Sequence, residues 1–216
     1  MNDASQELIR AVEQADSPAR LVAAVRSLAT AIDEAGIPTL IAVLGYNNPG
    51  AAVAAVEGLT QLGESAVQPL MGKLDDYNYG ARAYGIRALA AIADPRALDV
   101  LLTAAATDFA PSVRRAAAKG LGTLSWSRLS AEERQTAQAK ALQTLILVSQ
   151  DPDWSIRYAA VVGLQGLSTT PELSEEIQAQ FEQMAQNDAD LAVRARVQLA
   201  RTQLGIAAAV ATATGM

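Results

Sequence analysis

DPDWSIRYAAVVGL, residues 151–164, is the stretch that decides the fold, because four other segments of the chain align with it. In chain order the others are YNNPGAAVAAVEGL (46–59), DYNYGARAYGIRAL (76–89), DFAPSVRRAAAKGL (108–121) and DADLAVRARVQLAR (188–201). Four of the five begin with Asp, four carry Arg at the seventh position and four end in Leu. A pattern that returns every 30 to 43 residues is the mark of a repeat protein.

Each aligned segment predicts a turn followed by the second helix of a helix pair. In the repeat that contains residues 76–89, we expect a first helix over residues 67–74 and a second over 81–93. The Asp at the turn suits a helix N-cap, because its carboxylate accepts the free N–H groups of the first helical turn. Proline is tolerated in the first helical turn but not in the helix interior, so a proline indicates a helix start. On this basis first helices are predicted to start at Pro38, Pro69 and Pro95, and second helices at Pro49 and Pro111.

One helix pair cannot cover its own apolar face, so neighbouring pairs must stack. The sequence therefore predicts an all-α fold, a right-handed α-α superhelix (solenoid) of HEAT-like helix-pair repeats. We expect a single domain over residues 1–204, with an N-terminal helical cap at 1–36 and about five repeats over 37–204. Residues 205–216 are uncharged and rich in Ala and Thr, and we expect them to form a disordered tail.

Two details refine this prediction. The longest interval between repeats holds an insertion, in which Ser130 and Glu133 fit a capping box that opens the next helix. In the last repeat, Arg201 stands where the other repeats have Leu. An Arg at a position that is otherwise apolar indicates that the last repeat is a polar cap of the stack.

The composition excludes several classes of function. The net charge is −6 with no run of Lys or Arg, which disfavours binding to nucleic acid or to anionic membranes. The chain contains neither Cys nor His, so it offers no disulfide, no thiol nucleophile, no His-based triad and no conventional zinc site. We expect no metal and no other cofactor. With no signal peptide and no apolar stretch of membrane-spanning length, the expected location is the cytoplasm.

Most of the aromatic side chains share one place in the repeat. Seven of the nine lie in the turn or in the first two turns of a second helix: Tyr46, Tyr77, Tyr79, Tyr84, Phe109, Trp154 and Tyr158. Equivalent positions of stacked repeats lie side by side, so these rings predict a ribbon along one edge. Such rings, flanked by amide and guanidinium groups, suit a large, flat, conjugated ligand with a polar rim. The candidate binding residues are Tyr46, Asn47, Asn48, Tyr77, Asn78, Tyr79, Arg82, Tyr84, Trp154, Arg157 and Tyr158.

A purely structural interpretation of the same residues stays open. In it, the repeated Asp residues cap helices, and Arg114, Arg157 and Arg194 brace the adjacent repeat through carbonyl groups or ion pairs. The Asn-Asn-Pro and Asp-Tyr-Asn segments make good turns by themselves. Trp126, in the insertion, is interpreted as a packing anchor rather than as a ligand contact.

The segments YNNPGAA and DYNYGARA in tandem, followed by DFAPSVRRAAAKGLGTL and LVSQDPDWSIRYAAVVGLQGL, resemble the E/F-type phycobilin lyases. The resemblance covers about residues 5 to 200 and is nearest to the F (beta) subunits that act on the phycocyanin alpha subunit. It implies a heterodimer with a homologous E (alpha) subunit, associated with phycobilisome assembly. Together the two would attach phycocyanobilin to a cysteine of the phycocyanin alpha subunit through a thioether, and could remove it.

The resemblance has consequences for the site. The acceptor protein supplies the thiol, so a chain without Cys can still serve. As a hypothesis, Asp76 or Asp108 supplies the proton near ring A of the bilin. Related F subunits that also isomerise the bilin carry adjacent His and Cys residues, which this chain lacks, so isomerase activity is not expected. The alternatives are a non-catalytic HEAT-like adaptor that binds phycobiliproteins, and a general scaffold without pigment.

Overall fold

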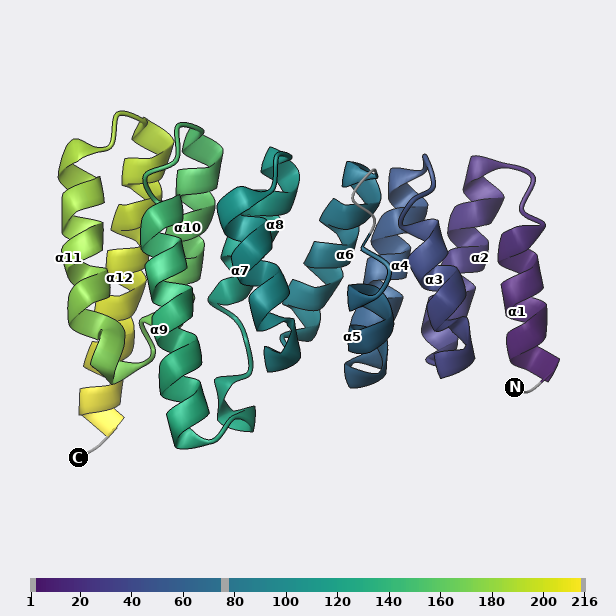
Figure 1. Cartoon of the computed structure of the whole chain (residues 1–216), viewed down its shortest axis with the longest axis horizontal. Helices are drawn as coiled ribbons and strands as arrows, with labels where there is room; N and C mark the ends of the chain where they lie inside the picture. Colours follow the sequence, from purple (N-terminus) through teal and green to yellow (C-terminus); the bar gives the residue numbers. More distant parts are fainter. Residues whose placement is uncertain (1–2, 75–77, 215–216) are drawn as a thin grey trace. The chain divides into compact units, whose positions relative to one another are not determined.

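The regular structure of this chain is entirely α-helical in the part that is described. A computed structural model describes residues 3–74 and 78–214, with side chains up to residue 205. Within those ranges there are helices and short 3-10 turns but no strand (Figure 1). The predicted all-α class is therefore confirmed.

The helices follow one another along the chain in pairs, each with a first and a second helix. The first six are α1 (Asp3–Glu13), α2 (Pro18–Ala31), α3 (Ile37–Val43), α4 (Pro49–Leu62), α5 (Glu64–Met71) and α6 (Tyr79–Ile92). The next six are α7 (Leu98–Thr107), α8 (Pro111–Leu121), α9 (Ala131–Val148), α10 (Trp154–Leu167), α11 (Pro171–Asn187) and α12 (Leu191–Thr214). The 3-10 turns η1 (Glu34–Gly36), η2 (Pro95–Ala97) and η3 (Trp126–Arg128) precede α3, α7 and α9. Helices α1 and α2 lie in the region, residues 1–36, for which the sequence predicts an N-terminal helical cap.

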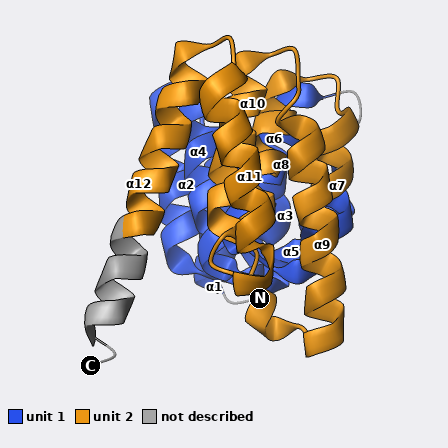
Figure 2. Cartoon of the chain, turned by 90° about the vertical axis from the view of Figure 1, so that its left-hand side faces the viewer, with its two compact units in different colours: residues 1–100 blue, residues 101–216 orange. Residues whose placement is uncertain are grey.

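The chain divides into two compact units, Met1–Val100 and Leu101–Met216 (Figure 2). In the first unit α4 lies between α2 and α6, and α3 and α5 pack beside this row. In the second unit α10 lies between α8 and α12, with α9 and α11 beside that row. Within each unit, the second helices of the pairs therefore form one layer and the first helices another, as stacked helix pairs require. The prediction of one domain over residues 1–204 stays a prediction.

Leucine at the end of the first four repeat motifs anchors the core. Leu59, Leu89, Leu121 and Leu164 are all fully buried. At the corresponding place in the last repeat, Arg201 is exposed and pairs with Glu182 at 2.8 Å. The polar end of the stack that the sequence predicts is thus present at this position. Each buried Leu removes an apolar side chain from water, which stabilises the fold by about 2 kcal/mol.

Several helix starts have the proline or capping residue that the sequence predicts. Pro49 and Pro111 occupy the first turns of α4 and α8, and Ser130 and Glu133 form the predicted capping box of α9. The prediction for Pro69 was wrong, because α5 begins at Glu64, so that Pro69 lies inside it. The helix starts earlier because Gly63, at φ 62°, ends α4 and opens α5 with no linker between them.

Two further predictions concern Trp126 and the C-terminal tail. Trp126 in η3 is half-buried, and its indole N–H is buried without a hydrogen-bond partner. Helix α12 includes most of residues 205–216, and the disorder expected for this tail stays a prediction.

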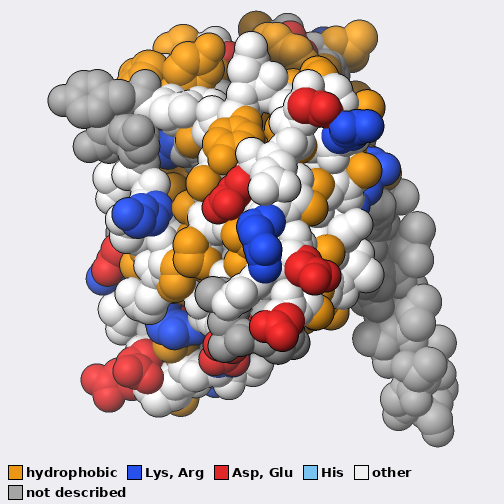
Figure 3. Space-filling view, turned by 90° about the vertical axis from the view of Figure 1, so that its right-hand side faces the viewer, with side chains coloured by type: hydrophobic (Ala, Val, Ile, Leu, Met, Phe, Trp, Pro, Cys, Tyr) orange, Lys and Arg blue, Asp and Glu red, His pale blue; other side chains and the backbone are white. Residues whose placement is uncertain are grey.

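No helix within residues 3–74 and 78–214 is long and apolar enough to cross a membrane. On the face beside α1, acidic and basic side chains are interspersed among apolar ones rather than gathered by sign (Figure 3).

Candidate functional site

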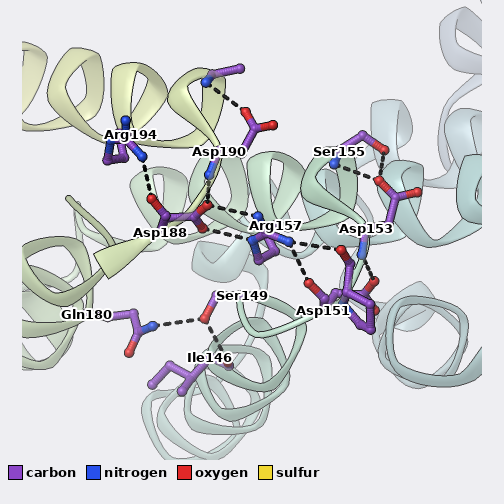
Figure 4. Close-up of polar contacts among 12 residues, drawn as sticks. Ile146, Ser149, Asp151, Asp153, Ser155, Arg157, Gln180, Asp188, Asp190 and Arg194 are labelled. Carbon is purple, nitrogen blue, oxygen red and sulfur yellow. Dashed lines mark hydrogen bonds and ion pairs between the residues drawn. The ribbon is translucent and has the colours of Figure 1, made fainter. Parts of the chain in front are cut away.

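In the second unit, ion pairs and hydrogen bonds link the repeated residues Arg114, Asp151, Arg157 and Asp188, an arrangement called the ladder below. Figure 4 shows the part of the ladder around Arg157. Arg157 on α10 donates from Nε and Nη2 to the two carboxylate oxygens of Asp188, both at 2.8 Å. Its Nη1 donates to the backbone carbonyl of Asp151 at 2.8 Å. Arg114 on α8 pairs in the same sense with the carboxylate of Asp151, at 2.5 Å. Each Arg therefore binds the Asp of the following repeat, and Arg157 also closes the turn of its own repeat.

The Asp residues do not cap their helices in the way the sequence predicts. Asp151 accepts the N–H of Asp153 at 2.8 Å, and it is Asp153 that caps α10 through the N–H of Ser155. Asp188 likewise accepts the N–H of Asp190, at 2.9 Å. The first Asp of the repeat thus folds the turn two residues before the cap. The reason is its position, because α10 begins at Trp154 and α12 at Leu191, three residues after Asp151 and Asp188.

The charged groups of the ladder stabilise one another. The hydrogen bonds from Arg157 lower the pKa of Asp188, and the same contacts with Asp188 raise the pKa of Arg157. Arg194 extends the pattern by donating to the carbonyl of Asp188 at 2.5 Å. The structural interpretation, in which these arginines brace adjacent repeats, is confirmed for Arg114 and Arg157. The bond printed for Arg194 closes the turn of its own repeat, so bracing by Arg194 stays a prediction. A direct contact between Arg157 and a ligand stays a prediction.

In the first unit, two candidate segments meet at the same end. A Cβ built on Gly45 would lie 3.2 Å from Nδ2 of Asn78, so the turn before α4 borders the start of α6. Tyr46 and Tyr79 are exposed by 44% and 59%, which leaves both rings free for contact with a ligand. Asn47 is exposed as well. The two turns that carry these residues therefore lie close together within this unit, and the gathering of their rings and amides into a binding surface stays a prediction.

The two other asparagines are engaged in helix caps. Asn48 accepts the N–H of Ala51 at 3.1 Å and donates to the carbonyl of Pro18 at 3.1 Å. Asn78 accepts the N–H of Ala81 at 2.9 Å. Asn48 thus uses both its amide oxygen and its amide nitrogen, whereas the cap of Asn78 uses its oxygen; these bonds account for an Asn in each turn without a ligand. Asp76 and Tyr77 lie outside the described residues.

The remaining candidates are less accessible. Arg82 is only 7% exposed. Tyr84 is half-buried, with the guanidinium carbon of Arg87 5.7 Å from its ring centre. Asp108 accepts the N–H of Ala110 at 2.8 Å. Contacts of these residues with a ligand stay predictions.

Trp154 and Tyr158 lie on α10 in the second unit. Trp154 is 48% exposed, whereas Tyr158 is half-buried under Arg196, whose guanidinium carbon lies 5.9 Å from the ring centre. Burial lowers the pKa of Arg196, and its Nη1 has no hydrogen-bond partner. Arg196 was not among the residues predicted from the sequence, because the other repeats have no Arg at its position.

A pocket of about 580 Å³ in the first unit was also missed. It is lined by Pro38, Ile41, Ala42, Gly45, Pro69, Gly72, Lys73, Asn78 and Ala81. These residues come from the ends of α3 and α5 and from the start of α6. Only Asn78 belongs to the predicted set. The signal that could have found the pocket is the clustering of small residues and prolines in two unusually short first helices.

Hydrogen bonds lower the pKa values of several described carboxyl groups, namely Asp33, Glu133, Asp153 and Asp188. A general acid at neutral pH needs the opposite shift. In the part of the chain that the structure describes, no group of three or more Asp, Glu, His or Cys side chains could hold a metal ion.

Known proteins resemble this chain over most of its length. HEAT repeats match residues 38–122 and 67–165. The phycocyanobilin lyase subunit beta of a Nostoc species is 62% identical over 199 residues, which is 92% of this chain and 100% of that protein. The chain belongs to the E/F-type phycobilin lyase family. A second member, the phycocyanin alpha phycocyanobilin lyase CpcF of a Synechocystis species, is 56% identical over 163 residues, 76% of each chain.

A solved structure of the same lyase family supports the fold. The complex of CpcE and CpcF of phycocyanin lyase from Nostoc matches with a TM-score of 0.77 and 64% identity. The match covers 78% of this chain and 99% of the chain in that complex. The resemblance stated from the sequence motifs is thereby confirmed, as are the HEAT-like helix pairs.

Proposed function

We propose that this chain is the beta-type subunit of a heterodimeric bilin lyase that attaches phycocyanobilin to a cysteine of the phycocyanin alpha subunit. The bond formed is a thioether, and the same subunit pair can remove the bilin. The observation that carries the proposal is the high identity to a phycocyanobilin lyase subunit beta along the whole of that protein. The partners are a homologous alpha lyase subunit and the phycocyanin alpha chain, and the place is the cytoplasm, where phycobilisomes assemble.

The chemistry needs little from this chain beyond positioning. The acceptor thiol adds across the ethylidene double bond of ring A, so a C–S bond forms and the thiol proton ends on the bilin. No oxidant, reductant or leaving group is required, and reversal breaks the same C–S bond. A chain with neither Cys nor His suits this role, since the nucleophile belongs to the acceptor. Holding two reactants in a reactive geometry can supply a large part of the rate.

The exposed rings can contact the bilin directly. Tyr46, Tyr79 and Trp154 present flat apolar faces to solvent, and a conjugated tetrapyrrole stacks favourably on such faces. The amide of Asn47 is available for the polar rim. The capping and buried candidates, which include Asn48, Arg82 and Arg157, would act by holding the turns in place. Asp108 is kept as the candidate proton donor together with Asp76.

Reconstitution tests this proposal. The purified chain is mixed with phycocyanobilin, the homologous alpha lyase subunit and the apo-phycocyanin alpha chain, and the alpha chain is examined for a covalent, red-absorbing adduct. We expect the adduct only in the complete mixture. A complete mixture without adduct would overturn the lyase function. Bilin binding without transfer would instead favour an adaptor that handles phycobiliproteins.

A further inference from the structure

The pocket between α3 and α5 differs in chemistry from the groove at the corresponding place of the second unit. The groove between α9 and α11 measures about 310 Å³ and is lined by polar side chains, among them Asp151, Arg157 and Asp188 of the ladder. The pocket of the first unit is larger, at about 580 Å³, and its walls are mostly apolar. The repeat architecture is the same in both places, so the difference lies in the side chains.

Two features of the sequence produce the larger pocket. Helices α3 and α5 have 7 and 8 residues, whereas α9 and α11 have 18 and 17. The ladder is also absent from the first aligned repeat, because Tyr46 replaces its Asp and Ala52 its Arg. Small residues then line the space that longer side chains would fill. The walls of this pocket include glycines, alanines and the rings of Pro38 and Pro69, which have no long side chains to fill the space.

The pocket carries one cation at its rim. Lys73 lines it and is exposed to solvent, and Asn78 adds an amide. The volume is within the range of about 300–1,000 Å³ that is usual for small-molecule sites. Flat apolar walls with one ammonium group fit a planar, conjugated body that bears a carboxylate. A bilin has this chemistry, with conjugated rings and two propionates.

We propose that the pocket lined by Pro38, Ile41, Pro69, Gly72 and Lys73 receives part of the phycocyanobilin, with Lys73 pairing with one propionate. This inference rests on the proposed lyase function and adds a site that the aromatic candidates do not include. The pocket borders that candidate surface, because Gly45 and Asn78 line it and are adjacent in sequence to Tyr46 and Tyr79. Rings stacked on those tyrosines could therefore continue into the pocket.

The first test fills the pocket. Gly72 has φ −75° and ψ −5°, and an added Cβ would meet only carbonyl oxygens, at 3.5 and 3.9 Å, so Gly72→Leu introduces bulk without backbone strain. Gly205→Leu is the matched control, since a Cβ there meets nothing within 4 Å. Phycocyanobilin is titrated into the heterodimer, and binding is followed by the change in bilin absorbance. We expect Gly72→Leu to raise the Kd about tenfold or more and the control to leave it unchanged.

The second test isolates the charge of Lys73. Lys73→Glu is compared with Lys140→Glu, an equal change of charge at another exposed lysine, on α9. The probes are phycocyanobilin and its dimethyl ester, which lacks the two negative charges. We expect Lys73→Glu to raise the Kd of the free acid about five- to tenfold and to leave that of the ester unchanged. Lys140→Glu should affect neither probe.

The outcomes separate this site from the proposed function. If Gly72→Leu and Lys73→Glu bind and transfer the bilin as the unaltered chain does, the pocket is not the site, and the lyase function stands. If the unaltered heterodimer forms no adduct, the lyase function fails whatever the variants bind. Equal weakening of acid and ester by Lys73→Glu would contradict the propionate contact. If Gly72→Leu loses helicity, the comparison of acid and ester at Lys73 still decides.

Discussion

Arg157 on α10 holds Asp188, the residue that follows α11, through two parallel hydrogen bonds of 2.8 Å. The side chains are exposed by only 15% and 5%, so the pair is largely withdrawn from water. The remaining nitrogen, Nη1, binds the carbonyls of Asp151 and Pro152. One side chain thus ties together the turn before α10 and the turn before α12. Because consecutive repeats in a solenoid contact only their neighbours, such ties hold the stack in register.

Removing one partner of this pair should destabilise the chain strongly. In Asp188→Ala, Arg157 stays largely buried without its counter-charge, and we expect a loss of about 3 kcal/mol in the free energy of unfolding. The measurement is urea denaturation followed by circular dichroism. Glu182→Ala is the control, because it breaks the exposed pair with Arg201 and should cost less than about 1 kcal/mol. Equal losses in the two variants would mean that the ladder contributes no special stability.

The same pair predicts how stability depends on pH. The pKa of Asp188 is lowered in the folded state, so its contribution is fully present above the unfolded value, near 3.8. That contribution is lost as the pH falls through the lower folded value. Stability should therefore be insensitive to Asp188 between pH 5 and 8, a range above both pKa values, and should decline below about pH 4. The difference in unfolding free energy between the unaltered chain and Asp188→Asn, measured from pH 7 to 3, should shrink only in that acid range.

Close approach of α8 and α10 requires glycine. A Cβ on Gly122 would lie 2.7 Å from the Cα of Gly163, closer than such atoms come without a shift of the backbone. Gly122→Ala should therefore cost about 1–3 kcal/mol or more by forcing the helices apart. Gly205→Ala is the matched control, at an open position within α12 where Ala favours the helix. Thermal melting of both variants checks the prediction, which fails if Gly122→Ala is as stable as the unaltered chain.

Exposed rings should matter for the bilin and not for the fold. In Tyr79→Ala and Trp154→Ala, rings that are 59% and 48% exposed are lost. We expect weaker bilin binding, by about three- to tenfold for each ring, with helicity and melting temperature unchanged. Leu147→Ala, which removes a 62% exposed side chain on α9, is the control and should leave binding as it was. Unchanged binding in both ring variants would move the ligand away from these turns.

Much of the fold was predictable from local pattern. The recurring motif placed α4, α6, α8, α10 and α12 near their observed starts, since helix periodicity and capping residues act within a few neighbours. Burial of Leu59 and Leu164 followed from the same repeat, and so did the exposure of Arg201. The start of α5 was missed because Pro69 is accommodated inside the helix, after Gly63 has already turned the chain.

The candidate site was predictable only in part, and the reason lies in the tertiary structure. By itself the sequence determined the helix pairs, the aromatic residues at the turns and, through the missing Cys and His, that no nucleophilic thiol comes from this chain. Only the stacking of helices decided that Asp188 accepts Arg157 and that Arg196 covers Tyr158, because those partners lie 31 to 38 residues apart. Stacking of the short α3 and α5 likewise produced the pocket at Lys73. A repeat motif specifies which face of each helix is buried, and the packing of neighbouring repeats then selects which side chains meet.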